Sequence, residues 1–168
     1  MRAKPPWARF LLAMWPEIGA VGAQLLFPDN TQQHTGVTVL QGSPGHPFYQ
    51  FPADHPGYFF SSQVHRNWSA VTAACMMTRT EVFKSVGGFT ESFPLNYNDV
   101  DYCLKVQETN RRIVCVPYAK LYHHESLTKS GTYAQELANF KKVWGKRFAR
   151  DPYYNPNLNL KAGDFSIG

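Results

Sequence analysis

A run of small and apolar residues at positions 17–27, EIGAVGAQLLF, limits the fold of this chain more than any other segment. It has the length of a strand and is followed by the turn-forming sequence Pro28-Asp29-Asn30, so it predicts a buried strand. A second run, SAVTAACMMT at 69–78, predicts a central strand that is buried on both faces.

The pattern around these runs alternates helices with short strands, which indicates a mixed α/β fold. Helices are expected where periodic apolar residues lie between start and stop signals, at 7–15, 80–86, 98–108 and 133–148. Asn98 or Asp99 would cap the third of them. Further short strands are expected at 36–40, 112–116 and 119–122. The segment 41–57, rich in Gly, Pro, His and aromatic residues, is expected to be an irregular loop that is more often functional than not.

Composition narrows the class of protein. The 168 residues are 43% hydrophobic and only 17% charged, which fits one globular domain and excludes a disordered chain. The cysteines at 75, 103 and 115 are odd in number and form no CxxC motif, so they indicate reduced, buried thiols. Since no apolar run has the ~20 residues of a membrane span, we expect a cytoplasmic protein.

The net charge of +5 is mild, and its densest part is the run KKVWGKR at 141–147, followed by Arg150. We interpret this run as a solvated helix face, or as a face resting on acidic lipid headgroups at the inner membrane. A nucleic-acid-binding stripe is the alternative, and it would require binding that weakens steeply with salt. We expect no nucleic-acid partner.

Two carboxylates stand close together at the start of the helix expected at 98–108, in the sequence Asn98-Asp99-Val100-Asp101. On their own, such residues most simply stabilise a helix N-terminus. They could also bind a cation or act as a general base. The Gly- and aromatic-rich sequence at 87–94 would deliver them to the end of a sheet, where ligand sites of open α/β sheets gather.

Two further groups of residues could carry chemistry. His123 and His124 follow a strand and precede Glu125, which suits Mn²⁺ or Mg²⁺ with at most one imidazole bound, although such a pair is also often structural. Zinc fits less well because no cysteine lies at ligand spacing. Trp68 offers a stacking face, and the small residues after it would let a ligand approach the backbone. Core packing explains those small residues equally well.

Seven motifs occur in an informative order: PEIGAVGA at 16–23, LLFPD at 25–29, QHTGV at 33–37, NWSAVTAAC at 67–75, VGGF at 86–89, NDVDYCL at 98–104 and YHHES at 122–126. In this order they resemble family 2 glycosyltransferases, and within that family bacterial enzymes of rhamnan, O-antigen and related surface-polysaccharide assembly. The resemblance covers about residues 5–150.

The resemblance implies a GT-A-like α/β fold with a mixed sheet and flanking helices. It also implies inverting transfer of a sugar from a nucleotide-sugar donor to a glycan or lipid-linked acceptor. Asp99 would be the base that deprotonates the acceptor hydroxyl, with Asn98 where the family often has Glu, and Asp101 would orient or charge-tune the site. His123, or less readily His124, would bind a Mn²⁺ or Mg²⁺ ion.

The same resemblance implies where substrates lie. Thr72, Ala73 and Ala74 resemble the family's acceptor and donor-sugar wall. With Trp68 and Asn98 they form the expected substrate-binding set.

The family's nucleotide-binding β-α-β unit and its DxD motif have no counterpart before residue 98. We therefore expect residues 1–150 to be the C-terminal, acceptor-side half of a GT-A domain, residues 151–168 to be an irregular tail, and catalysis to belong to an intact parent. A half sheet exposes an edge and apolar surface, so self-association or a partner chain is expected. The alternative is a non-catalytic module that grips a glycan through Trp68, Tyr58 and Phe59.

Overall fold

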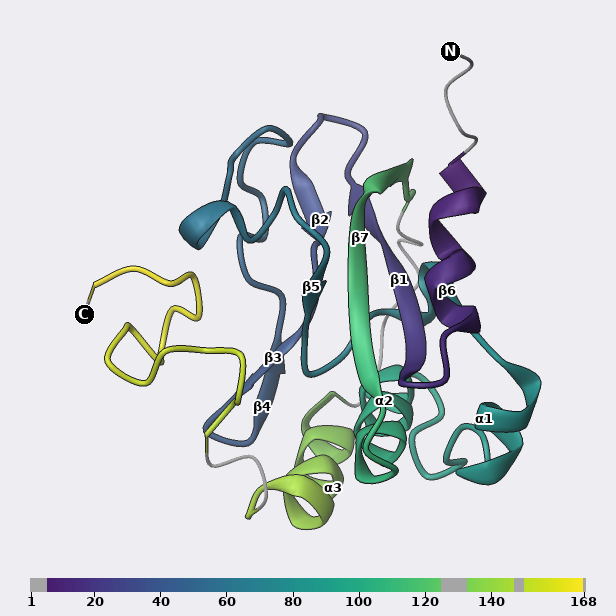
Figure 1. Ribbon diagram of the computed structural model, residues 1–168. Coiled ribbons are helices and arrows are strands. Elements are labelled where there is room, and N and C mark those ends of the chain that lie inside the picture. Colours follow the sequence, from purple (N-terminus) through teal and green to yellow (C-terminus); the bar gives the residue numbers. More distant parts are fainter. Residues whose placement is uncertain (1–5, 125–132, 147–149, 168) are drawn as a thin grey trace.

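A mixed β-sheet forms the centre of the protein in the computed structural model, which describes residues 6–124, 133–146 and 150–167 (Figure 1). The five strands of the sheet are β1 (Ile18–Leu26), β2 (Gln32–His34), β5 (Arg66–Asn67), β6 (Met76–Thr78) and β7 (Arg112–Tyr122). β1 and β7 are parallel neighbours, β5 pairs with the far side of β7, and β2 and β6 share the other side of β1. This arrangement confirms an α/β fold with a mixed sheet.

Helices cover the two faces of this sheet. One face of β1 and β7 packs against the 3-10 helix η1 (Pro6–Met14) through an apolar cluster that includes Phe10 and Ala13. The other face packs against α2 (Asn98–Glu108). α1 (Thr80–Ser85) and α3 (Tyr133–Trp144) also contribute to that second cluster.

Small residues of β1 let α2 and its neighbours approach the sheet. A Cβ atom added at Gly19 would lie 2.1 Å from Val106 Cγ1, and one added at Gly22 would lie 2.5 Å from Val71 Cβ. Both glycines are therefore needed for close packing. All nine residues of β1 are buried, which confirms the buried strand expected at 17–27.

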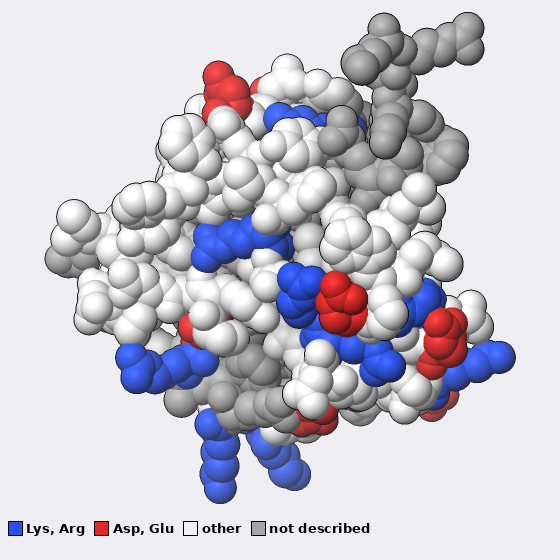
Figure 2. Space-filling view, in the orientation of Figure 1, with Lys and Arg blue, Asp and Glu red and all other residues white. Residues whose placement is uncertain are grey.

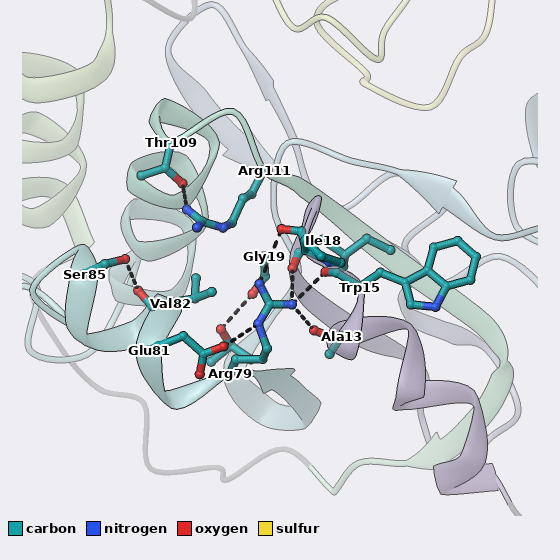
Figure 3. A network of polar contacts seen from close by, with 12 residues as sticks. Ala13, Trp15, Ile18, Gly19, Arg79, Glu81, Val82, Ser85, Thr109 and Arg111 are labelled. Carbon is teal, nitrogen blue, oxygen red and sulfur yellow. Dashed lines mark hydrogen bonds and ion pairs between the residues drawn. The ribbon is translucent and has the colours of Figure 1, made fainter.

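Arg79 fastens η1 to the sheet, as Figure 3 shows. Its Nη1 donates hydrogen bonds to the carbonyl oxygens of Ala13 at 2.6 Å, Trp15 at 2.6 Å and Ile18 at 3.2 Å. Its Nε donates to Glu81 Oε1 at 2.8 Å. One guanidinium thus satisfies carbonyl groups at the end of η1 and at the start of β1, which fixes the angle between the two elements.

The prediction of one continuous strand at 69–78 is wrong. Ala70 forms only an isolated bridge with Val37, and residues after it turn into the 3-10 helix η3 (Ala73–Cys75) before β6 begins. The turn has a local cause, because the Thr72 side chain accepts a hydrogen bond from the Ala74 N–H at 3.3 Å. Such local bonds compete with the strand ladder.

Two other expectations need correction. β7 is one strand across Pro117, and its register against β1 jumps from Val116 to Lys120 in a bulge. Proline is tolerated in a bulge because no ladder bond is lost there. α2 begins at Asn98 as expected, but its N-cap is Tyr97 in the left-handed conformation (φ 63°), not Asn98 or Asp99.

The segment 41–57 contains one regular element. β3 (Thr38–Leu40) and β4 (Ser43–Gly45) form a hairpin whose turn residues Gln41 and Gly42 both have positive φ, 51° and 73°. This is the backbone that two-residue hairpin turns require. The short helix η2 (Tyr58–Phe60) follows.

The last described segment, 150–167, forms no helix or strand but packs into the core. Phe165 stacks on Phe48 with ring centroids 5.4 Å apart. Asp151 accepts hydrogen bonds from Val39 N and from Ser69 Oγ, both at 2.6 Å. None of the described helices is long and apolar enough to cross a bilayer.

Candidate functional site

A cavity of about 560 Å³ opens beside the carboxyl ends of the parallel strands β1 and β7. It is lined by Leu25, Gln33, His34, His46, Tyr49, Thr72, Ala73, Ala74, Leu95, Asn98, Asp99, His123 and His124. Ligand sites of α/β sheets lie at this end of the strands. The cavity thus brings together most of the residues that the sequence singled out, from positions as far apart as 72 and 124. We call it the central cavity.

Asp99 lies at the start of α2, where its carboxylate meets the backbone of η3. Oδ2 accepts a hydrogen bond from Ala73 N at 3.0 Å, and Oδ1 accepts one from Val100 N at 2.8 Å. Each carboxylate oxygen has a second lone pair, so Asp99 can still accept a proton or a hydrogen bond from a ligand. The two backbone bonds fix its orientation.

His123 follows β7, and its backbone N–H continues the ladder to Leu26 O at 2.9 Å. Its ring Nδ1 lies 2.7 Å from Gln33 Oε1, while Gln33 Nε2 donates to the His123 carbonyl at 3.4 Å. Because an amide oxygen only accepts, Nδ1 carries the hydrogen and Nε2 is left with a lone pair. The arrangement orients the ring as an outer partner orients a ligating histidine.

Three residues of the cavity wall form a second polar chain. Thr72 N donates to His34 Nε2 at 3.3 Å, and His34 Nδ1 lies 3.0 Å from His46 Nδ1. Since Nε2 of His34 accepts, its Nδ1 is the donor to His46. Burial, with the charge of His46 as a smaller cause, lowers the pKa of His34 well below its usual value, so the ring is neutral.

Two predicted site residues lie away from the central cavity. Trp68 is 0% exposed and carries the Arg66 guanidinium 4.3 Å from its ring centroid, so the expectation that it offers a ligand a stacking face is not met. Asp101 is also buried: it accepts from Trp144 Nε1 at 2.8 Å and Thr90 Oγ1 at 2.6 Å, and pairs with Lys105 at 3.2 Å. These bonds join α2 to Trp144 of α3 and to Thr90 in the loop that precedes α2.

Sequence reasoning assigned no role to Gln33, His34, His46 or Glu136. Glu136 of α3 is 5% exposed, and its Oε2 accepts from the backbone N–H groups of Asn96 at 2.7 Å and Leu95 at 3.4 Å. Leu95 lines the central cavity, so α3 holds the loop that leads to Asp99. The sequence did contain one signal for Glu136: it is an acidic residue on the apolar face of a helix whose other charged residues are lysines.

The structure shows which donor groups are available for the expected cation. Among the described residues, no group of three or more Cys, His, Asp or Glu side chains could hold a metal ion. His123 Nε2 can supply one ligand, so a bound cation would take its other ligands from a substrate or from another segment. Glu125, the third residue of the expected cluster, lies outside the described residues.

The three cysteines are free thiols. Cys103 and Cys115 are buried and Cys75 is half-buried. Burial raises the pKa of Cys103 and raises that of Cys115 to about 12. They act as small apolar groups of the core rather than as nucleophiles.

In its organisation the chain is an α/β protein with an open cavity at the carboxyl ends of parallel strands. No protein-family model matches it. It is 40% identical over 175 residues to the uncharacterized protein y4gI of Sinorhizobium fredii, covering 97% of this chain and 19% of that protein. It is 40% identical over 173 residues to the O-antigen biosynthesis protein RfbC of Myxococcus xanthus, covering 97% of this chain and 13% of that protein. The chain thus spans less than a fifth of the length of these curated relatives.

Proposed function

We propose that this chain is the acceptor-side part of an inverting, GT-A-like glycosyltransferase of surface-polysaccharide biosynthesis. The observation that carries the proposal is the meeting of Asp99, His123 and the 72–74 backbone in one cavity at the carboxyl ends of β1 and β7. The printed name of the Myxococcus relative, an O-antigen biosynthesis protein, supports the same area of function.

The chemistry proposed for Asp99 is general-base catalysis. An acceptor hydroxyl in the central cavity gives its proton to an Asp99 oxygen as the hydroxyl oxygen forms a bond to the anomeric carbon. The bond from that carbon to the donor phosphate breaks, and the nucleoside diphosphate leaves with the electron pair. The bonds from Ala73 N and Val100 N keep the carboxylate aimed during this step.

His123 is proposed as the protein ligand of a divalent cation bound with the donor. When bound, such a cation neutralises charge on the diphosphate leaving group. Gln33 would then keep the ring oriented and, through the bond at Nδ1, favour the neutral tautomer whose lone pair is on Nε2. Asn98 and the Thr72–Ala74 wall would contact the sugars.

The part of the donor site that contacts the nucleoside is proposed to come from a segment outside this chain, while this chain supplies the cation ligand beside the diphosphate. Apolar side chains of η1 and of the residue after it are exposed, with Leu11 at 52%, Met14 at 63% and Trp15 at 54%. Exposed apolar surface of this kind is typical of an interaction face. It supports a partner, whether another domain of a longer polypeptide or a second chain.

The first test is calorimetric titration of the chain with nucleoside diphosphates, with and without Mn²⁺. We expect binding that requires Mn²⁺ and is lost in His123→Ala. His124→Ala, a change at the adjacent histidine of the same cavity, is the matched control and keeps the binding. If no nucleoside diphosphate binds in the presence of Mn²⁺, this chain does not carry the proposed cation ligand.

A non-catalytic glycan-binding module is the second candidate, and one observation favours it. Phe59 and Phe60 are 83% and 62% exposed on η2, and both have positive φ. Aromatic rings presented in this way suit the apolar faces of sugars. Glycan binding that survives chelator and Asp99→Asn but is lost in Phe59→Ala would support this candidate over the transferase.

A further inference from the structure

A second hollow adjoins the central cavity on the side of α3. It has a volume of about 370 Å³ and lies between the β3–β4 hairpin, Lys141 of α3 and the segment 160–163. A smaller hollow of about 220 Å³ lies between it and the central cavity. His46 lines all three hollows, and Pro44 and Gly45 line the first two. The three hollows therefore share the wall at His46, and we call this row of hollows, two of which Asp99 lines, the trough.

The hollow beside α3 is positively charged. Lys141 and Lys161 line it from separate segments, and its lining contains no carboxylate. Neither lysine forms an ion pair with a residue in the described part of the chain. In Figure 2, Lys and Arg side chains project from the lower edge of the molecule, the region where α3 lies in Figure 1.

Two acidic residues close in sequence to this lining, Asp164 and Asp151, accept hydrogen bonds from other groups. Asp164 accepts a hydrogen bond from Ser166 N at 2.9 Å, and its pKa is lowered mainly by Ser166. Asp151 accepts its bonds from Val39 N and Ser69 Oγ. Among the described residues, no carboxylate lines the hollow to neutralise the two ammonium groups.

Neutral donors complete the lining. Thr38, Gln41 and Ser43, whose side chains carry hydroxyl and amide groups, line the hollow from the β3–β4 hairpin. Ammonium and hydroxyl donors around one hollow match the several acceptor oxygens of a phosphate better than the two of a carboxylate.

We propose that this hollow binds a phosphate or diphosphate group of a molecule that extends along the trough. At about 370 Å³, and next to a hollow with which it shares Pro44, Gly45 and His46, the site has room for more than an isolated phosphate. If the proposed function holds, the group belongs to the acceptor, whose sugar end reaches Asp99. Anion binding at Lys141 and Lys161 does not itself depend on that function.

The test is a calorimetric titration of the full chain with inorganic pyrophosphate at low ionic strength. We expect Lys141→Gln and Lys161→Gln each to weaken binding about tenfold, and the double variant to abolish it. Lys142→Gln is the matched control, because this exposed neighbour makes the same charge change and does not line the hollow. Circular dichroism confirms that each variant is folded.

Equal affinity in the double variant and in Lys142→Gln would overturn the proposal, as would a lack of pyrophosphate binding by the unmodified chain. Asp99→Asn separates this site from the proposed activity, because it should leave pyrophosphate affinity unchanged even where sugar transfer is lost. Failure of the transferase proposal would thus leave the anion site standing.

Two sources of the phosphate can be distinguished with vesicles. If the group is a lipid headgroup, the chain binds phosphatidylcholine vesicles that contain phosphatidic acid, pyrophosphate competes, and the double variant does not bind. If it belongs to a soluble molecule, pyrophosphate binds in the same lysine-dependent way and the vesicles do not. Vesicle binding that the double variant retains would contradict a headgroup at this hollow.

Discussion

The two aspartates at the start of α2, Asp99 and Asp101, lie on opposite faces of the helix and in different surroundings. Asp99 faces the central cavity, half-buried, with both carboxylate oxygens bonded only to backbone N–H groups. Asp101 faces the core, 3% exposed, bonded to Trp144, Thr90 and Lys105. Because a helix turns ~100° per residue, a spacing of two places side chains on nearly opposite faces. One carboxylate is left for a ligand, and the other holds three segments together.

The strongest test of this contrast is Asp99→Asn in a parent polypeptide that contains the donor-binding part. We expect transfer to fall about a thousandfold, because the amide cannot take the acceptor proton. The melting temperature should stay nearly unchanged, since the amide oxygen still accepts a backbone hydrogen bond. Retained turnover would show that Asp99 is not the base.

The converse change is Asp101→Asn, which we expect to lower the free energy of unfolding by about 3 kcal/mol. The amide leaves the Lys105 ammonium without its counter-charge beside Thr90, where Lys105 also donates a hydrogen bond at 2.8 Å. Urea unfolding measures this difference. Glu108→Gln on the exposed face of α2 serves as the control, and an equal loss there would contradict a special role for Asp101.

A change in α3 tests whether Glu136 holds the loop at Leu95 and Asn96, which leads to the central cavity. Glu136→Ala removes the acceptor of the Leu95 and Asn96 N–H groups, so we expect a loss of about 2 kcal/mol and faster hydrogen exchange at both amides. Glu136→Gln keeps one oxygen acceptor and should restore most of the protection. Exchange rates that are the same in all three proteins would show that α3 does not hold this loop.

The smallest expected effect is on pH dependence. The folded chain keeps the pKa of His34 well below 6.5, whereas the unfolded chain takes up a proton near 6.5. The free energy of unfolding is therefore not reduced by His34 above pH 6.5. As the pH falls from 6.5 toward the pKa of the folded state, the unfolded chain takes up the proton and the free energy of unfolding decreases. The slope is at most about 1.4 kcal/mol per pH unit.

This slope is measured by urea unfolding at several pH values on both sides of 6.5. His34→Gln should show a smaller decrease in stability at acidic pH than the unmodified chain. His65→Gln replaces a solvent-exposed histidine and should leave the decrease unchanged. Identical pH profiles for the unmodified chain and His34→Gln would contradict the assignment.

Regular elements with a clear pattern were predictable from the sequence. β1 was found because its residues are small or apolar apart from Gln24, and α2 because its apolar residues recur at helical spacing. β2 was missed because its residues, QQH, are polar. Their burial depends on partners far along the chain, such as Pro52 O, which accepts from Gln32 Nε2 at 2.9 Å. A local pattern cannot contain that information.

The cavity was also predictable only in part, because some of its residues stand out in the local sequence and others depend on distant contacts. Asp99, His123 and the 72–74 segment were identified as candidates, and all line one cavity. The burial of Trp68 away from the cavity was not predictable. It depends on Arg66, which covers the ring, and on Phe165, whose ring centroid lies 6.3 Å from that of Trp68. Phe165 lies far along the chain from Trp68, so the local sequence does not reveal that contact, and nothing in the local sequence shows on which side of the ring Arg66 lies.

The packing of residues 150–167 decides where this unit can be joined to other domains in evolution. Gene fusions keep a domain intact only when the junction falls outside its core. A junction placed at residue 150 would remove Phe165 from its place against Phe48 and Tyr58, with ring centroids at 5.4 and 5.2 Å, and would take away the Asp151 acceptor of Val39 N. Recombination that moves α2 and the sheet between longer proteins must therefore carry this irregular segment with it.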